Sequence, residues 1–516
     1  MPQTALAETE TDRRAFLPQL TRSEILAVSA IVAAGLVLRV RYSLITYLNP
    51  DEASHALNSF NGWSEMFTYS YQVDKHPPLL MFMTHLILLI SRNDLALRLI
   101  PILCGCLFPM FFGLWLARVA GKFAGMAALF LLTLTPHLVI ISAQVRTYTL
   151  AFLFLSASLV AFEIAIDAGR WPAMLAFDVF LFLSICSDYS SAWFAGAVGI
   201  YALMRLGRSP FPLKVAWAAG QLAPLIFYGA LFFGNVRHIP ASSRAENARI
   251  HWLSHGFPHP SHMLRFPVVN TAQQFNFVMA SLPLGILAWA MFAAGIYFLW
   301  SGRTSIPREN ARPLAILLTV PFFLGIIGAY AKVFPYGATR QSAVIGILGV
   351  AGVAIFLEFV PRPSRTIIAG TAVVPILIWL LIPNPDKLDI PPWRNRKSQM
   401  LACLSYMRTN IPPGARIFAD RETLQMLTFY TGGRGPLPPS DTFIELPLAD
   451  RWRVAVRDYD YGTQGQFRVA LAAFRAQYRI GAGEPVWVVD GGFAVHTGPP
   501  DETLPFTRAF RVFHTP

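Results

Sequence analysis

Residues 24–43, EILAVSAIVAAGLVLRVRYS, form a long apolar run that is followed by PDEASH at 50–55 and by KHPPL at 75–79. A run of about 20 mainly apolar residues is long enough to cross a bilayer as a helix. Ionisable groups this close to hydrocarbon are costly unless they do chemistry or bind a partner. These stretches predict a membrane protein with a functional site just outside its first span.

The composition of the chain also indicates a membrane protein. Of its 516 residues, 54% are hydrophobic and only 14% are charged, and the mean hydropathy is +0.46. A water-soluble protein of this length needs a more highly charged surface. We predict a polytopic α-helical protein with about eleven spans plus interfacial helices. The predicted spans are 24–43, 97–117, 122–141, 147–167, 171–187, 189–206, 214–235, 273–300, 312–332, 341–360 and 366–383.

Segment 77–91 is apolar but short, and the positive-inside rule settles how it is interpreted. If it does not span, the arginines and lysines of most loops face the cytoplasm, as the rule expects. These residues are Arg13, Arg14, Arg22, Arg118, Lys122, Arg170, Arg205, Arg208, Lys214, Arg303, Arg308, Arg312, Arg362 and Arg365. We therefore expect a multi-pass protein of the plasma membrane whose first span is an uncleaved anchor.

This topology divides the chain into three parts. They are a cytoplasmic segment at 1–23, a transmembrane domain at 24–383 and an external domain at 384–516. In the last part, strands at 415–419 and 485–489 alternate with helices at 421–430 and 463–478, which is typical of a small α/β domain. We interpret this domain as a lid or docking module without chemistry of its own.

The net charge of +13 comes partly from the cytoplasmic anchors and gives no support for nucleic-acid binding. Cys104, Cys106 and Cys186 lie inside apolar segments, and Cys403 stands alone in the tail. Their spacing indicates neither a disulfide framework nor a thiolate metal site.

Asp51 and Glu52 follow Pro50 just beyond the first predicted span. A carboxylate at the membrane surface can act as a general base toward a hydroxyl nucleophile. The alternative is a purely structural one, because Asp after Pro is also typical of a helix start.

Lys75 and His76 precede two prolines, which allow a helix to begin there and prevent it from extending backwards. A helix N-terminus beside two basic groups favours an anion such as phosphate. The alternative is an interfacial anchor in which Lys75 only reaches toward the head groups.

Arg146 and Tyr148 lie in a short external turn in the same prediction, and Arg340 lies in another, GATRQ at 337–341. Each arginine is either a phosphate ligand or an anchor at the interface. In the predicted loop 236–272, His251 and His255 have the i, i+4 spacing of a helical metal pair, but no third ligand is specified. We expect this basic loop to receive an anionic lipid head group instead.

In this order the motifs resemble the GT-C-fold membrane glycosyltransferases, in particular the protein O-mannosyltransferase and lipid A aminoarabinose transferase group. The shared features are the Asp-Glu pair after the first span, His-Pro-Pro-Leu, Arg98-Leu99-Ile100-Pro101 at the start of a span, Arg-x-Tyr at 146–148, and GATRQ at 337–341. The likeness covers roughly residues 24–383.

The resemblance implies an enzyme that moves one sugar, with inversion, from a polyprenyl-phosphate carrier to an external acceptor hydroxyl. It implies Asp51 as the base with Glu52 in support, and Lys75 or His76 on the donor phosphate. We add Arg146, Tyr148 and Arg340 to the groups expected to bind the substrate. The acceptor is a glycan, a lipid or a protein.

Many members of this group carry an acid five residues after the arginine, where this chain has Ala151, and bacterial relatives often have Glu where it has Gln144. We therefore expect no required cofactor and no metal site. The alternative function is a transporter or flippase for a phosphate-bearing lipid or sugar. That function favours charges near the middle of the bilayer, whereas these are predicted at its outer surface.

Overall fold

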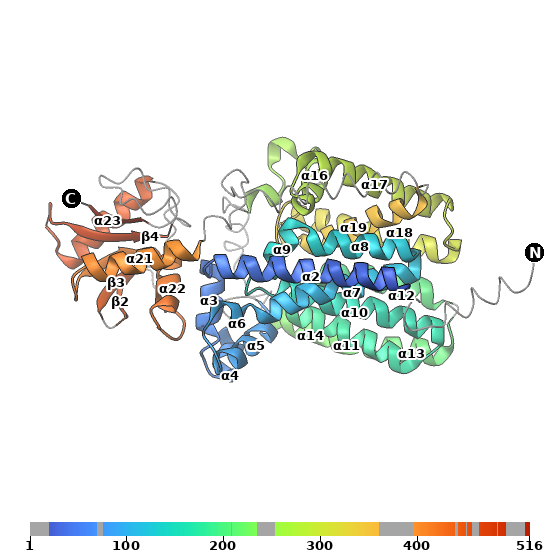
Figure 1. The fold of residues 1–516 in the computed structure, drawn as a ribbon, viewed down its shortest axis with the longest axis horizontal. Coiled ribbons are helices and arrows are strands. Elements are labelled where there is room, and N and C mark those ends of the chain that lie inside the picture. The colour runs from blue at the N-terminus through green and yellow to red at the C-terminus, as the bar shows by residue number, and fades with distance from the viewer. Residues whose placement is uncertain are drawn as a thin grey trace, which may run out of the picture. The chain divides into compact units, whose positions relative to one another are not determined.

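The computed structural model describes residues 20–69, 76–207, 209–234, 253–360, 396–438, 442–449, 451–456, 464–481, 483–491 and 511–515 (Figure 1). The chain forms two compact units. Unit 1 comprises Met1–Arg39, Ser70–Leu80 and Ile100–Ile382, and unit 2 comprises Val40–Tyr69, Met81–Leu99 and Pro383–Pro516. The predicted division at residues 23 and 383 stays a prediction.

Unit 1 is helical. Its elements, including three helices that begin in one unit and end in the other, are α2 (Arg22–Ile45), α5 (Leu79–Leu88), α7 (Leu99–Ala120), α8 (Lys122–Leu134), α9 (Pro136–Ser142), α10 (Tyr148–Ala168), α11 (Trp171–Ser187), α12 (Ser191–Leu206), α13 (Phe211–Gly220), α14 (Leu222–Gly234), η3 (Ser254–Gly256), η4 (Pro260–His262), α16 (Phe266–Met279), α17 (Leu282–Ser301), α18 (Arg308–Tyr330) and α19 (Ala343–Phe359).

Five described helices are long and apolar enough to cross a membrane, namely α2, α7, α10, α17 and α18. Predicted spans 24–43, 97–117, 147–167 and 312–332 correspond to α2, α7, α10 and α18. Spans 171–187, 189–206 and 341–360 correspond to the shorter apolar helices α11, α12 and α19. Helix α5 has ten residues and is about 15 Å long, too short to span. The total of eleven spans stays a prediction, since 366–383 lies outside the described residues.

Three predicted spans are not single helices. Segment 122–141 is the bent pair α8 and α9, whose axes differ by 63°, because Pro136 has no N–H to continue the ladder. Segment 214–235 breaks between α13 and α14 at Gln221. The prediction for 273–300 was wrong at its start: α16 ends at Met279, and Ala280 adopts a left-handed conformation with φ of 52° before α17 begins.

A buried arginine braces the bend between α8 and α9. Arg39 of α2 has no exposed surface. Its Nη1 donates to the carbonyl of Thr133, 3.0 Å away, and its Nε donates to Ser142 Oγ at 2.8 Å. The guanidinium therefore binds the last turn of α8 and the last residue of α9. A helix C-terminus leaves carbonyls unsatisfied, and a cation there is favourable.

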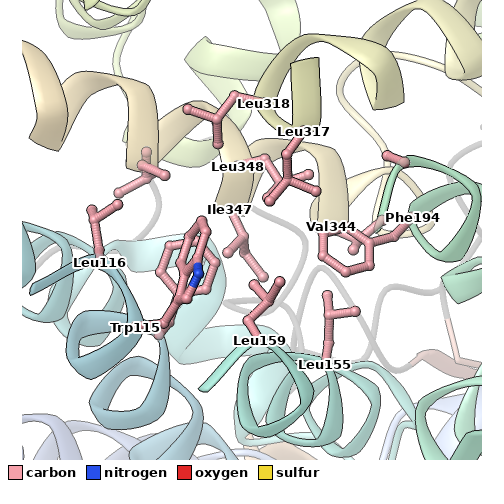
Figure 2. Close-up of a cluster of buried hydrophobic side chains, with 14 of the residues drawn as sticks. Trp115, Leu116, Leu155, Leu159, Phe194, Leu317, Leu318, Val344, Ile347 and Leu348 are labelled. Atoms are coloured by element: carbon pink, nitrogen blue, oxygen red, sulfur yellow. The ribbon is translucent and has the colours of Figure 1, made fainter. Parts of the chain in front are cut away.

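The core of unit 1 lies where helices distant in sequence meet. Trp115 and Leu116 of α7, Leu155 and Leu159 of α10, and side chains from α12, α18 and α19 pack together (Figure 2). Because close-packed interiors tolerate little displacement, this cluster fixes the helix ends that carry polar residues.

One end of unit 1 is rich in charge. A cavity of about 330 Å³ is lined by the ends of α7, α10 and α12 and by the approach to α18, with Arg118, Asp167, Arg205 and Glu163 among its residues. Arg118 pairs with Asp167 at 2.7 Å, and Arg205 pairs with Glu163 at 3.0 Å. We call this the basic end of unit 1, after its arginines and Lys122.

Unit 2 combines a sheet with helices from both termini of the chain. Besides the end of α2, most of α5 and the first residue of α7, its elements are α3 (Pro50–Asn58), α4 (Trp63–Tyr69), α6 (Asp94–Leu97), α21 (Lys397–Asn410), β1 (Arg416–Ala419), α22 (Arg421–Tyr430), β2 (Ile444–Leu448), β3 (Trp452–Val456), α23 (Gln464–Tyr478), β4 (Val486–Asp490) and β5 (Arg511–Thr515).

The strand order is β2-β3-β1-β4-β5. β1 is parallel to both β3 and β4, whereas the edge strands β2 and β5 are antiparallel to their neighbours. The predicted strands at 415–419 and 485–489 correspond to β1 and β4, and the predicted helices correspond to α22 and α23. Buried phenylalanines of β1 and α23, Phe418, Phe467 and Phe474, fill one face of the sheet.

The stability of this sheet is expected to depend on pH through Asp420, which follows β1. Burial, and then the nearby Asp490, raise the pKa of Asp420 to about 6 from 3.8. The folded state therefore binds more protons than the unfolded state between about pH 4 and 6, and stability falls as the pH rises through that range, by roughly 2–3 kcal/mol. Amide hydrogen exchange of β1 and α22 in the full-length protein should accelerate accordingly.

Asp420→Asn keeps the cap of α22, because Asn also accepts from the Thr423 N–H that Asp420 binds at 2.8 Å. In this variant, exchange in β1 and α22 should lose the extra pH dependence relative to α10 in the same sample. An unchanged pH profile in Asp420→Asn would show that another group is responsible.

Candidate functional site

The two candidate carboxylates lie in the first turn of α3. Asn49 is the N-cap, Pro50 occupies the first turn, and the side chains of Asn49 and Glu52 form a capping box. Glu52 N donates to Asn49 Oδ1 at 3.0 Å, and Asn49 N donates to Glu52 Oε2 at 3.1 Å. The structural alternative for this stretch thus applies to Asn49 and Glu52, and Asp51 is not the cap.

Glu52 is also half of a buried ion pair. Arg98 Nε donates to Glu52 Oε1 at 2.8 Å, and its Nη2 donates to Oε2 at 2.9 Å. Both side chains are 1% exposed. The other Arg98 donors reach the carbonyls of Ser43, Thr46 and Tyr47 at 3.0–3.2 Å. One guanidinium therefore ties the end of α2 to the start of α3.

The two adjacent carboxylates have different surroundings. Glu52 accepts two charge-assisted bonds and one backbone bond in a dry site, which fixes its orientation. Asp51 is half-buried. Glu52 is therefore suited to hold α3 in place, and Asp51 is the more exposed carboxylate of this pair.

The second candidate group, Lys75 and His76, is described only in part. Lys75 lies outside the described residues. His76 is half-buried and is followed by the buried Pro77. As the two prolines predict, the next helix, α5, begins directly after them at Leu79.

Arg146 lies between α9 and α10, and Tyr148 is the first residue of α10. Arg146 is half-buried and Tyr148 is buried. The turn is tight, since Arg146 N donates to Gln144 O at 2.7 Å. A helix of 21 residues starts beside Arg146, so its free N–H groups add positive potential there.

Asp188, which was not among the predicted site residues, anchors this turn. Its carboxylate accepts from Thr147 Oγ1 at 2.8 Å and from Ser190 N at 2.7 Å. Asp188 is buried, with 4% of its surface exposed. It lies between α11 and α12 and holds the residue that directly follows Arg146. In the sequence, Asp188 before Tyr189-Ser190 suggests only a helix start, because its partner is 41 positions away.

Arg340 belongs to a turn held by several buried contacts. Tyr336 N donates to Gly256 O at 2.9 Å, and Asn270 Nδ2 donates to Tyr336 O at 2.8 Å. Gly337 has φ of 114°, and a Cβ there would lie 2.9 Å from Asn270 Nδ2. Only glycine fits that position. Arg340 itself is half-buried.

Within unit 1, Arg146, Tyr148 and Arg340 lie at the same end. Helix α10 runs from Tyr148 to the basic end, where Asp167 lines the cavity, and α18 starts at that cavity and ends ahead of the turn with Arg340. These three residues are therefore opposite the basic end. Asp51 and Glu52 belong to unit 2, and their convergence with the other candidates stays a prediction.

Among the residues that the structure describes, no group of three or more His, Cys, Asp or Glu side chains is arranged to hold a metal ion. His251 lies outside those residues. His255 is exposed in η3, and its Nε2 lies 3.2 Å from the carbonyl of Ala338. The metal requirement of the protein stays a prediction.

With this geometry in view, comparison with known proteins gives three findings. The family described as dolichyl-phosphate-mannose-protein mannosyltransferase matches residues 75–232. No curated protein sequence matches the chain significantly. The third finding is a similarity to solved structures.

ArnT from Cupriavidus metallidurans in the apo state is similar with a TM-score of 0.52 and 15% identity, over 94% of this chain and 97% of that chain. The same protein bound to undecaprenyl phosphate gives a TM-score of 0.50 at the same identity and coverage. At this identity the likeness concerns the fold. The predicted resemblance to GT-C-fold membrane glycosyltransferases is confirmed.

The Arg98–Glu52 pair gives a stability prediction. Glu52→Ala leaves Arg98 buried without its carboxylate, which should destabilise the protein by about 3–5 kcal/mol. Adding Arg98→Met removes the stranded charge, so the double variant should be more stable than Glu52→Ala alone. Thermal unfolding of the purified full-length protein measures both effects.

Asp51→Ala is the matched control, because it removes the adjacent carboxylate from the same helical turn. We expect it to unfold within a few degrees of the wild-type protein. If Glu52→Ala proved as stable as Asp51→Ala, the ion pair would not be what holds α3.

Proposed function

We propose that the protein is a membrane glycosyltransferase that moves one sugar from a polyprenyl-phosphate carrier to an acceptor hydroxyl on the external face of the plasma membrane. The family match at residues 75–232 and the ArnT-like fold support this class of reaction. ArnT bound to undecaprenyl phosphate supports a polyprenyl-phosphate carrier as the donor. The sugar and the acceptor are not assigned.

The assignment of the base rests on the difference in contacts and burial between the neighbouring carboxylates of Asp51 and Glu52. Arg98 and Asn49 bind Glu52, which is buried, whereas Asp51 is half-buried. A general base must come within hydrogen-bond reach of the proton it removes. The partial exposure of Asp51 supports its assignment as the base, and the contacts of Glu52 support a role in fixing the helix.

In this mechanism, Asp51 accepts the proton of the acceptor hydroxyl while the oxygen attacks the anomeric carbon. The bond from that carbon to the phosphate oxygen breaks, and polyprenyl phosphate leaves with the electron pair. Attack opposite the leaving group inverts the anomeric centre. Negative charge grows on the phosphate in the transition state, so cations placed there lower the barrier directly.

We assign the phosphate to Lys75, His76, Arg146, Tyr148 and Arg340. The support within unit 1 is that Arg146 and Arg340 lie at one end, in turns fixed by buried contacts from Asp188 and Asn270. A fixed guanidinium stabilises a developing charge without first having to reorganise. The site is proposed to work without a metal ion.

The sidedness of the proposal rests on the charges of unit 1. Arg118, Lys122 and Arg205 gather at the basic end, opposite Arg146. Basic residues favour the cytoplasmic side of a membrane. The end with Arg146 and Arg340 is then external, where the acceptor is expected.

The test compares lipid extracts by mass spectrometry from cells that lack this protein and cells that express it. The deletion should accumulate one polyprenyl-phosphate sugar, and wild-type protein should clear it. Asp51→Asn should fold and still bind polyprenyl phosphate, yet leave the accumulated lipid at the deletion level, because a neutral amide cannot take the proton.

Glu65→Gln is the control, since Glu65 is an exposed carboxylate on α4 in the same unit. It should clear the lipid as the wild-type protein does. Normal clearance by Asp51→Asn would remove Asp51 from the mechanism. Identical extracts from deletion and wild-type cells would refute the donor class.

A further inference from the structure

A single phenol in unit 2 joins three segments that are far apart in the sequence. Tyr430 is the last residue of α22. Its hydroxyl donates to Asp94 Oδ2 at 2.6 Å and accepts from the backbone N–H of Leu48 at 2.8 Å. Leu48 is fully buried and Asp94 is 4% exposed, so both bonds are made away from water.

Both hydrogen-bond partners of Tyr430 lie close in sequence to the residues that hold α3, the helix of Asp51. Leu48 immediately precedes Asn49, the N-cap of α3. Asp94 is the first residue of α6, whose C-cap is Arg98, the partner of Glu52. Asp94 also pairs with Lys397 of α21 at 3.1 Å. The hydroxyl therefore bonds the residue before the N-cap of α3, the helix that carries Asp51. It also bonds the first residue of α6, which is capped by Arg98, the ion-pair partner of Glu52.

Further contacts attach α22 to the same segments. Gln425 Nε2 lies 3.3 Å from Ser54 Oγ of α3. Arg92 donates to the carbonyls of Gly432 and Gly433 at 2.9 and 2.7 Å, at the C-terminal end of α22, where a cation is favourable. Helix α22 thus contacts α3.

The chemistry of the two bonds requires a neutral phenol. Tyr430 donates its only proton to a carboxylate while its oxygen accepts from Leu48. Burial, and then the charge of Asp94, raise the pKa of Tyr430. The hydroxyl therefore keeps its proton at physiological pH, and Tyr430 can make both bonds throughout that range.

We propose that Tyr430 is a positioning residue through which the C-terminal segment of the chain sets the place of Asp51. The inference rests on the proposed role of Asp51 as the base. The C-terminal segment then takes part in the reaction by holding the base, in addition to any docking role. Without the hydroxyl, Leu48 N–H has no acceptor and the start of α3 is free to shift.

The consequence of such a shift is kinetic. A displacement of about 1 Å between reacting groups costs up to 100-fold in rate. Tyr430 acts on the base and not on the groups assigned to the donor phosphate. Its loss should therefore lower kcat and leave the KM for the donor unchanged.

The test is Tyr430→Phe in the full-length protein in lipid nanodiscs. The donor is the polyprenyl-phosphate sugar that accumulates in the deletion strain, and envelopes of that strain supply the acceptor. We expect kcat to fall about ten-fold or more, with the donor KM within two-fold of wild type. Tyr478→Phe is the matched control, because Tyr478 lies half-buried on α23 of the same unit, and it should behave as wild type.

Asp94→Asn is the second variant, and it tests whether the two residues act together. It weakens the same link, so combining it with Tyr430→Phe should lower kcat little beyond the worse single variant. Wild-type kcat in Tyr430→Phe, or a rise in donor KM with kcat unchanged, would overturn the inference.

A measurement without turnover separates this inference from the proposed function. Hydrogen exchange at residues 48–58 should accelerate in Tyr430→Phe and not in Tyr478→Phe. If the wild-type protein transferred no sugar, the proposed function would fail, and this exchange result would still show whether Tyr430 holds α3. Equal exchange in both variants would reject the link itself.

Discussion

The buried pair between Arg98 and Glu52 is the constraint on which the candidate site depends. Two charges taken out of water are costly, and they persist because every donor of the guanidinium finds an acceptor. The pair fixes the direction in which α3 leaves the end of α2. Asp51 therefore presents its carboxylate from a rigid turn, and Tyr430 adds a second attachment to the same turn.

Buried polar contacts also hold the end of unit 1 that lies opposite the basic end. Asp188 holds the turn with Arg146, Asn270 holds the turn with Arg340, and Arg39 binds both halves of the broken helix that leads to Arg146. These groups are buried, and each supports a loop rather than facing solvent. Loops that carry function need such support, because a connecting segment has few packing contacts of its own.

The sequence predicts those parts of the fold that depend on local pattern. Apolar runs located α2, α7 and α10, and alternation located β1 and β4. Local pattern failed at Ala280, whose left-handed conformation separates α16 from α17. It placed Asp51 and Glu52 together as candidates, but it could not identify the ion pair that Glu52 makes. That ion pair depends on Arg98, 46 positions away, just as the role of Tyr430 depends on residues 336 and 382 positions away.

The proposed mechanism gives the Asp51 carboxylate the role of base and gives Arg146 and Arg340 the role of phosphate ligands. The most direct measurement is an experimental structure of the protein with its polyprenyl-phosphate sugar bound. We expect the phosphate beside Arg146 and Arg340, with Asp51 facing the anomeric carbon on the opposite side of the sugar. A phosphate bound among Arg118, Lys122 and Arg205 at the basic end, or an Asp51 carboxylate turned away from the sugar, would contradict this mechanism.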